Sequence, residues 1–294
     1  MKNILFLTDL CKDDTQLYTM AVNMCSQIGC NLQVLNLYNG VPYVPSLDAG
    51  SYQAKWYSDA YDGHREAFKE LMEKIEKVSA SLPENARRPQ ISSVLTEGDL
   101  GTVVKEYTIG KDTALVIMGA GQSGVLSHML FGDAVRAVIH ASSVPVLIQA
   151  PGSKSIKVNE KVIFATDFNN NDLDACSYLS FLGERLGFSV EVVHVKSERG
   201  IHPGEIEREQ RFVEEIKRLG RKNLTYRHLM GGNVFGLLEQ WSKILKAGWI
   251  ALSEHHRPVF VSIFKKNTLK VAISEQKMPL LIFPENFQKG EYFL

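Results

Sequence analysis

Residues Lys2–Asp9 read KNILFLTD, and the chain returns to the same pattern as KVIFATD at Lys161–Asp167. In both copies a short apolar run ends in Thr-Asp, and the second pair follows the first after 158 positions. The next apolar run keeps this offset, because LQVLNLY at Leu32–Tyr38 aligns with VEVVHVK at Val190–Lys196. A fixed period of this kind indicates one structural unit that is used twice.

Later segments repeat at a smaller offset of 134 positions. EGD at Glu97–Asp99 corresponds to GGN at Gly231–Asn233, and ALVIMG at Ala114–Gly119 corresponds to GWIALS at Gly248–Ser253. The difference between the two offsets gives the first copy 24 additional residues, between positions 39 and 96.

The length and the repeat together predict the domain organisation. A chain of 294 residues suffices for two domains, since a single core usually stops growing near ~250 residues. We predict a first domain at 1–150 and a second at 160–294. The segment between them, PGSKSIKVN at 151–159, has the Gly, Ser, Pro and Lys content of a linker.

Within each copy, short apolar runs alternate with segments of helical periodicity. Most residues in these runs are apolar and do not alternate with polar ones, which is typical of strands buried on both faces of a parallel sheet. In the first copy we expect strands at 4–8, 32–37, 91–96, 114–119 and 145–149, and helices at about 14–29, 57–78, 99–109 and 133–141. This order predicts an α/β fold of two repeated doubly wound domains, each with a five-stranded, mainly parallel sheet.

Composition excludes several classes of partner. Lys+Arg and Asp+Glu both number 33, so no net charge favours nucleic acid or an anionic membrane. Apolar runs stay below the ~18 residues of a membrane span, and the N-terminal run is too short for a signal peptide, so we expect a cytoplasmic protein. The four cysteines form no CxxC pair, and we expect them to be ordinary small residues in a reducing compartment.

The Thr-Asp strand ends, the EGD turn before a helix and the segment LFGDAVRAVIHASSVPVLI at 130–148 together resemble the universal stress protein family in its tandem, two-domain form. The resemblance covers nearly all of the chain and is strongest at 114–148. It implies a Rossmann-like fold of the adenine nucleotide alpha-hydrolase type, a role in the stress response and association into dimers.

In nucleotide-binding members of that family a loop reads G-x2-G-x9-G-[S/T], and an aspartate at the end of the first strand meets the adenine. Gly119 and Gly132 match this pattern, whereas Gln122 and Asp133 depart from it. A carboxylate at 133 would repel a phosphate by roughly 1 to 4 kcal/mol at about 4 Å. Asp133 is equally explained as the cap of the helix that starts there. The resemblance gives these candidate nucleotide-binding residues: Asp9, Thr8, Leu37, Gly119, Gly121, Gly124, Gly132 and Asp133.

Two interpretations stay open for the residues at the strand ends. Asp9 and Asp167 either accept a hydrogen bond from an adenine amino group or tie down the turn into the next helix. Thr8 and Leu37 either line a base pocket or pack in the core.

The second copy of the loop departs further from the family pattern. The stretch SEHHRPVFVSIFKKN at 253–267 contains no glycine, and its proline hinders a backbone wrapped around phosphate. Lys265 and Lys266 attract an anion by charge alone or form a solvated turn. His255 and His256 are adjacent, so they share no helical face for a metal, and we expect no metal site.

The sequence leaves two classes of function open. GxxxxGK[ST], GxSxG and HExxH motifs are absent, and the GxGxxG at 119–124 follows the fourth strand of its copy instead of the first, so we expect no catalytic residue. One reading is a stress-response regulatory protein whose nucleotide binding is weak or lost. The other is an ATP-binding protein, with slow hydrolysis, that uses the first domain; ATP is the only cofactor it requires.

The expected partners are the other domain of the same chain, a second copy in a homodimer, and an unidentified protein. The aromatic-rich segment at 40–64, in the region where the first copy is longer, is a candidate contact surface. It either covers its own helices or forms a lid or interface, and we favour a contact with the other half or a second chain.

Overall fold

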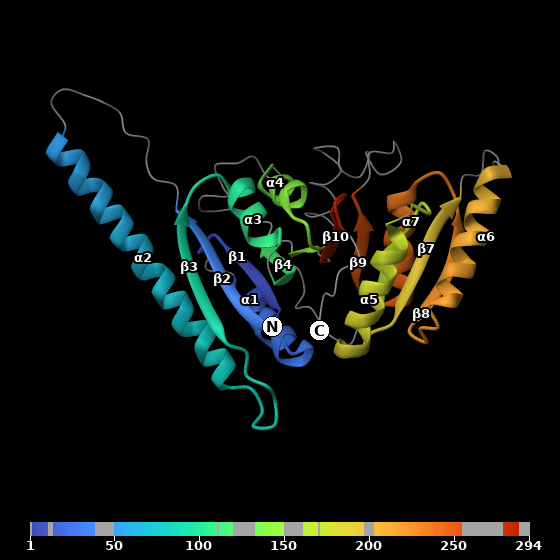
Figure 1. Cartoon of the computed structure of the whole chain (residues 1–294), viewed down its shortest axis with the longest axis horizontal. Coiled ribbons are helices and arrows are strands. Elements are labelled where there is room, and N and C mark those ends of the chain that lie inside the picture. Colours follow the sequence, from blue (N-terminus) through green and yellow to red (C-terminus); the bar gives the residue numbers. More distant parts are fainter. Residues whose placement is uncertain are drawn as a thin grey trace.

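The computed structural model describes residues 2–10, 14–38, 50–110, 112–119, 133–149, 161–169, 171–196, 203–254 and 279–287, with the backbone alone at 50–60, 133, 203 and 235. Figure 1 shows strands side by side through the middle of the molecule, with α2 at one end and α6 at the other.

The first half follows the predicted order of elements, and the second half follows it as far as β9, after which residues 255–278 lie outside the described part. The first half contains β1 Asn3–Thr8, α1 Thr15–Ile28, β2 Asn31–Tyr38, α2 Gly50–Ala80, β3 Ile91–Glu97, α3 Leu100–Thr108, β4 Thr113–Gly119, α4 Asp133–Ala141 and β5 Val146–Gln149. The second half contains β6 Lys161–Ala165, α5 Asp172–Leu186, β7 Val190–Lys196, α6 Pro203–Arg218, β8 Leu224–Met230, α7 Val234–Leu245, β9 Ala247–Ser253 and β10 Leu280–Phe283.

The strands form one ten-stranded sheet in the order β3-β2-β1-β4-β5-β10-β9-β6-β7-β8. Each half contributes five strands that pair in parallel, and the halves meet where β5 and β10 pair antiparallel, with Leu147 opposite Leu281. The predicted fold class, two doubly wound five-stranded units, is therefore confirmed.

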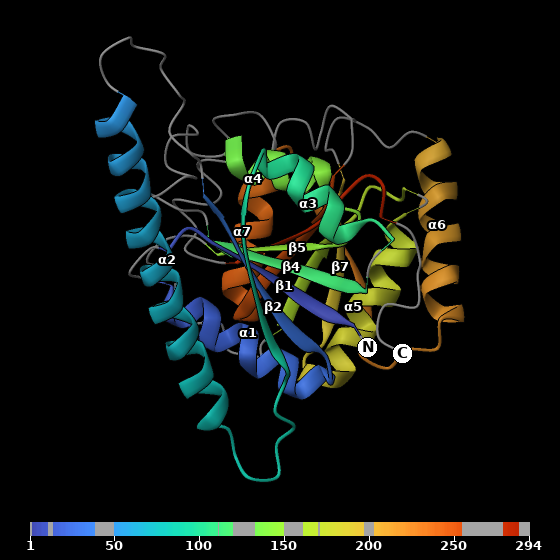
Figure 2. The same cartoon turned by 60° about the vertical axis from the view of Figure 1, so that its left-hand side comes forward.

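Each face of the sheet has its own hydrophobic core. Because side chains alternate along a strand, Phe6 belongs to a core that includes residues of α1, α2, α5 and α6, whereas Leu7 belongs to one that includes residues of α3, α4 and α7. Figure 2 shows α1 on one side of the first-half strands and α3 and α4 on the other. Helices on both faces leave the carboxyl edge of the strands as the place for a site.

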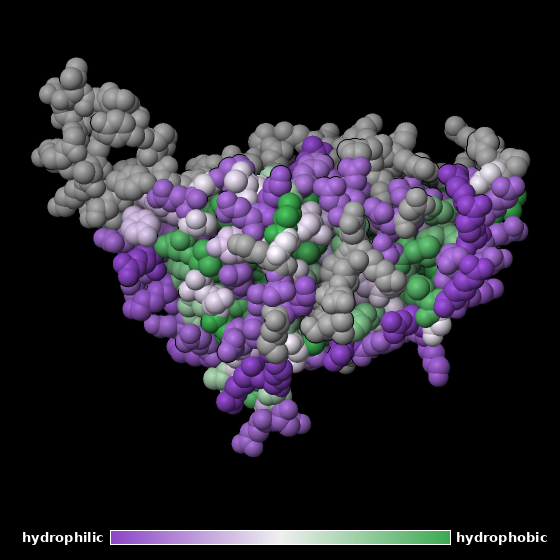
Figure 3. All heavy atoms as spheres, viewed as in Figure 1, coloured by the Kyte–Doolittle hydropathy of each residue, from purple (hydrophilic) through white to green (hydrophobic). Residues whose placement is uncertain are grey.

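The long helix α2 accounts for much of the predicted excess in the first half, since it has 31 residues where its counterpart α6 has 16. Its periodic face is buried at Phe68, Leu71 and Ile75, and Tyr61 contacts Tyr38 of the same half, with ring centroids 5.4 Å apart. Residues 40–49 and the side chains of 50–60 lie outside the described part, so the interface role of 40–64 stays a prediction. α6 presents a largely hydrophilic outer side (Figure 3).

Two helices begin with side-chain caps from the EGD and GGN segments. Asp99 accepts a hydrogen bond from the backbone N–H of Thr102 over 2.9 Å, and Asn233 accepts one from Gly236 over 3.0 Å. Across the described ranges, no helix combines the length and the apolar character that a membrane crossing needs.

Candidate functional site

The turn after β1 has an unusual backbone that recurs after β6. Leu10 and Phe168 both adopt positive φ angles, 61° and 65°, a left-handed conformation that costs a bulky residue about 1 to 3 kcal/mol. In each turn the N–H of this residue donates to a threonine hydroxyl, that of Thr8 over 3.1 Å and that of Thr166 over 2.9 Å. The carboxyl edge of each half is thus held in a defined and strained shape.

A second aspartate in each turn, which the sequence reasoning missed, fixes the threonine. Thr8 Oγ1 donates to Asp14 Oδ2 over 2.8 Å, and Thr166 Oγ1 donates to Asp172 Oδ2 over 2.7 Å. The signal was available, because Asp14 and Asp172 keep the 158-position offset of the repeat.

The structure brings several first-half candidates to one edge. Thr8 and Gly119 end the adjacent strands β1 and β4, and Asp9 follows directly. Thr8 is 5% exposed with its hydroxyl engaged in the turn, and Leu37 is 7% exposed within the hydrophobic core. Gly119 lies beside the start of α1, since a Cβ added there would be 3.7 Å from Asp14 Oδ1.

The remaining candidates are placed only in part. α4 begins at Asp133, so its amino-terminal end follows the predicted loop, but the Asp133 side chain is not described. Gly121, Gly124 and Gly132 lie outside the described residues, as do His255, His256, Lys265 and Lys266 of the second loop.

At the first-half edge, Asn36 and His64 form a chain of hydrogen bonds between β1, β2 and α2. Asn36 Nδ2 donates to the carbonyl of Thr8 over 2.8 Å, and His64 Nε2 lies 2.5 Å from Asn36 Oδ1. Burial lowers the pKa of His64, which favours the neutral ring. The ring centroid of Tyr38 lies 5.0 Å from that of His64.

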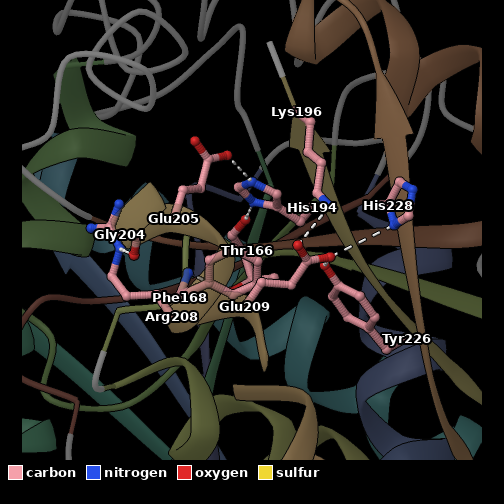
Figure 4. Close-up of polar contacts among 10 residues, drawn as sticks. All are labelled: Thr166, Phe168, His194, Lys196, Gly204, Glu205, Arg208, Glu209, Tyr226 and His228. Carbon is pink, nitrogen blue, oxygen red and sulfur yellow. Dashed lines mark hydrogen bonds and ion pairs between the residues drawn. The ribbon is translucent and has the colours of Figure 1, made fainter. Parts of the chain in front are cut away.

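The same edge of the second half carries ionisable groups instead (Figure 4). His194 takes the place of Asn36, with Nδ1 2.8 Å from the Thr166 carbonyl and Nε2 3.1 Å from Glu205 Oε1 of α6. The Phe168 ring packs on the imidazole with centroids 4.2 Å apart. This arrangement fills the space between the strand ends and α6.

A buried ion pair lies two residues further along β7. Lys196 Nζ is 2.5 Å from Glu209 Oε2, and Tyr226 donates to Glu209 Oε1 over 2.8 Å. Burial opposes ionisation of Glu209, but the hydrogen bonds from Lys196 and Tyr226 and the charges of Lys196 and His228 outweigh it and lower its pKa. Burial and the contact with Glu209 raise the pKa of Tyr226. The sequence signalled this cluster only through polar residues at alternate positions of an otherwise apolar strand.

The end of β9 carries a hydroxyl where the end of β4 carries a glycine. Ser253 occupies the position equivalent to Gly119, and its hydroxyl donates to Asp172 Oδ1 over 2.7 Å. The next residue, Glu254, donates its backbone N–H to the Phe283 carbonyl over 2.7 Å, and its Oε1 lies 2.7 Å from His140 Nδ1 of the first half.

The described residues were also compared with the requirements of a metal site and of a reactive thiol. Among the described residues, His, Cys, Asp and Glu side chains form no group of three that would hold a metal ion. Burial raises the pKa of Cys25 and Cys176 well above the ordinary thiol value, which suppresses the reactive thiolate.

Comparison with known proteins agrees with this geometry. The model of the universal stress protein family matches residues 1–149, half of the chain. The crystal structure of a universal stress protein from Archaeoglobus fulgidus DSM 4304 is similar over 96% of this chain and 96% of that chain, with 17% identity and a TM-score of 0.65. A functionally unknown protein from Pseudomonas aeruginosa PAO1 is similar over 97% of this chain and 93% of its own, with 13% identity and a TM-score of 0.56.

No curated protein sequence matches the chain. At these identities the solved structures establish the fold, and the family match over the first half establishes descent. The repeated Thr-Asp turns extend the same architecture to the second half. The chain belongs to the universal stress protein family.

Proposed function

We propose that this stress-response protein is a cytoplasmic regulatory module in which nucleotide binding is weak and confined to the first half. The observation that carries the proposal is the contrast between Gly119, which has no side chain to bond Asp14, and Ser253, whose hydroxyl is bonded to Asp172. Family membership supports the role in the stress response.

Glu254 makes the second half a poor phosphate site. A phosphate loop needs free backbone N–H groups and positive potential at the strand end. Here the Glu254 N–H is used by the Phe283 carbonyl, and a carboxylate that is 8% exposed stands where the loop begins. Like charges at this point disfavour any bound phosphate.

The first half keeps a glycine at the end of β4 but departs from parts of the family loop. Gln122 and Asp133 replace a glycine and a hydroxyl residue of the resembled pattern. A weak site is the expected outcome of an intact edge and an altered loop.

A second candidate function is an ATP-binding protein, with slow hydrolysis, that uses the first half. It is favoured by the helix start at Asp133, since a helix amino terminus attracts anions. For either function we propose that the regulatory output passes to a protein partner or to a second copy of the chain, and not to nucleic acid or a membrane.

A thermal-shift titration of the full chain with ATP and magnesium tests the proposal. Ligand at 100 times its dissociation constant adds about 2.7 kcal/mol of stability, so a tight site gives a clear shift at micromolar ATP. We expect a shift only at millimolar ATP and a larger one after Gln122→Gly with Asp133→Ser. A shift at micromolar ATP in the unaltered chain would favour the second candidate. If Ser253→Gly in the second half increased the ATP-induced shift as much as the first-half changes do, nucleotide binding would not be confined to the first half.

A further inference from the structure

The carboxyl end of α1 brings two cysteines together. The N–H groups of Gly29 and Cys30 both donate to the Cys25 carbonyl, over 3.0 and 3.1 Å, and Gly29 adopts a left-handed φ of 88°. In helix ends of this type, the residue after the glycine regularly contacts the residue five positions before it. The backbone bond between these two residues keeps their Cα atoms close to the separation of about 4.4 to 6.8 Å that a disulfide spans.

Cys25 and Cys30, here called the thiol pair, turn their sulfur atoms into one buried corner. Cys25 Sγ lies 3.3 Å from the Asn31 carbonyl oxygen, and Cys30 Sγ lies 4.0 Å from the Cys25 carbonyl oxygen. Burial and a hydrogen bond with the Cys30 thiol raise the pKa of Cys25. Both thiols are free, and they are 0% and 2% exposed. The pair is therefore protected while this corner of the fold stays closed.

The second half keeps this helix end without the thiol pair. Gly187 follows α5 with a φ of 78°, and the N–H groups of Gly187 and Phe188 donate to the Gly183 carbonyl over 2.8 and 3.0 Å. The offset of 158 positions places Gly183 and Phe188 where the first half has the thiol pair. The helix end therefore does not depend on cysteine, and the thiol pair is a separate feature of the first half.

A cation lies beside the thiol pair, in the turn that precedes β3. Arg87 Nη1 donates to the Cys30 carbonyl over 2.8 Å, and Nη2 donates to Asn31 Oδ1 over 3.2 Å. The guanidinium charge acts against burial and favours the Cys25 thiolate, as arginine does beside reactive cysteines. Residues 83–85 of the same turn are exposed. Because helix ends and exposed turns open locally at a lower free energy than the core, a small oxidant can enter this corner without global unfolding.

Oxidation to a disulfide is the modification that fits a filled core. Joining the two sulfur atoms removes two hydrogen atoms and adds no atom, whereas a sulfinic acid or a mixed disulfide adds atoms to a closely packed site. We propose that Cys25 and Cys30 are a site of oxidative modification, at which a peroxide converts the thiol pair into a disulfide that fastens the end of α1. The fastened helix packs against α2 and, across the halves, against α5.

The reaction balances with hydrogen peroxide as the oxidant. One thiolate attacks a peroxide oxygen, the O–O bond breaks, and the products are a sulfenic acid and, after protonation, water. The second thiol attacks the sulfenic sulfur, the S–O bond breaks, and a second water leaves as the S–S bond forms. The two sulfur atoms are oxidised by two electrons in total, and the peroxide takes both. The site is separate from the proposed nucleotide site, since α1 ends at the edge of the sheet where β2 begins.

Thiol mapping of the full chain tests the proposal. The folded protein is treated with hydrogen peroxide, and the remaining thiols are labelled with N-ethylmaleimide in urea and located by mass spectrometry. Cys25 and Cys30 share one tryptic peptide, 13–55, so the disulfide gives an unlabelled peptide that is lighter by two hydrogen atoms. Dithiothreitol should restore both labels. We expect this change to proceed several-fold faster than the loss of label at Cys176, which is equally buried on α5. In the oxidised protein the amides of Gly29 and Cys30 should exchange hydrogen more slowly than in the reduced protein.

Cys30→Ala is the matched variant, because it keeps Cys25 but removes its partner. Its peptide 13–55 should never become lighter by two hydrogen atoms. The unaltered chain alone also decides. If its peptide keeps both labels at a peroxide concentration that oxidises the same thiols in the urea-unfolded chain, the folded site does not react and the proposal is overturned. Oxygen atoms that dithiothreitol does not remove, or a disulfide from either cysteine to Cys11 or Cys176, would equally overturn the pairing of Cys25 with Cys30.

Discussion

Lys196 Nζ and Glu209 Oε2 lie 2.5 Å apart, and each side chain is only 11% exposed. Lys196 comes from the last position of β7 and Glu209 from α6, so the pair joins the helix to the sheet at the functional edge. Charges removed from water are costly unless each retains its partner. The second half therefore depends on an intact pair where the first half uses neutral side chains.

Removing one member of this pair should destabilise the protein strongly. Lys196→Met leaves Glu209 buried without its cation, and we expect a loss of about 3 to 5 kcal/mol in the free energy of unfolding. Urea denaturation measures it. The surface pair of Lys69 and Glu66, with side chains 65% and 63% exposed, provides the control: Lys69→Met should change the free energy by less than about 0.5 kcal/mol. Similar losses of unfolding free energy in both variants would show that the buried pair stabilises the protein no more than the exposed pair does.

Acid should weaken the same contact. The pKa of Glu209 in the folded protein lies below its ordinary value of 4.5, so ionised Glu209 contributes stability that is complete above pH 4.5 and is lost as the pH falls through the lowered pKa. Glu209→Gln should therefore flatten the decline in stability below pH 4.5, relative to the unaltered chain. Denaturant unfolding at a series of acidic pH values gives the comparison, and parallel declines in the two proteins would refute the assignment.

A buried hydrogen bond connects α5 of one half to β4 of the other. Tyr178 of α5 donates its hydroxyl to the Ala114 carbonyl of β4 over 3.0 Å. Tyr178→Phe should cost about 1 to 3 kcal/mol, because a buried carbonyl loses a donor. Tyr18→Phe is the matched control, since the Tyr18 hydroxyl bonds only at 3.3 Å to Thr15 in its own helix. Equilibrium unfolding of both variants measures the two losses in free energy. An equal loss would show that the hydrogen bond between the halves contributes no more than the bond within α1.

Much of the fold could be predicted because its signals are local or periodic. The constant offsets located the repeat, and the caps at Asp99 and Asn233 follow from turn chemistry that acts over three residues. The continuous apolar runs became strands buried on both faces, as Leu5 and Phe6 illustrate at 0% exposure.

The cluster of ionisable side chains at the second-half edge could not be predicted from local or periodic patterns. His194, Glu205 and Tyr226 lie on three different elements, and only the folded sheet brings them to one corner. Burial also decides what each group does: Lys196 reads as an ordinary charged residue at a strand end until Glu209 is placed against it. The asymmetry between Gly119 and Ser253 was visible as a residue difference, but its meaning came from the position of Asp172.

A glycine inside α5 makes the close approach of two other segments possible. A Cβ at Gly183 would lie 2.6 Å from the carbonyl oxygen of Phe188 and 2.8 Å from Asn223 Nδ2. The first contact is with backbone and cannot rotate away, so Gly183→Ala should cost about 1 to 3 kcal/mol through forced displacement. Gly63→Ala in α2 is the matched change, since nothing lies within 4 Å of its Cβ position, and it should stabilise the protein by about 0.5 to 1 kcal/mol through helix propensity. Thermal unfolding of the two variants should therefore shift in opposite directions. A stabilised Gly183→Ala would mean that the turn at Phe188 relaxes freely, and that the packing of α5 against the start of β8 does not depend on this glycine.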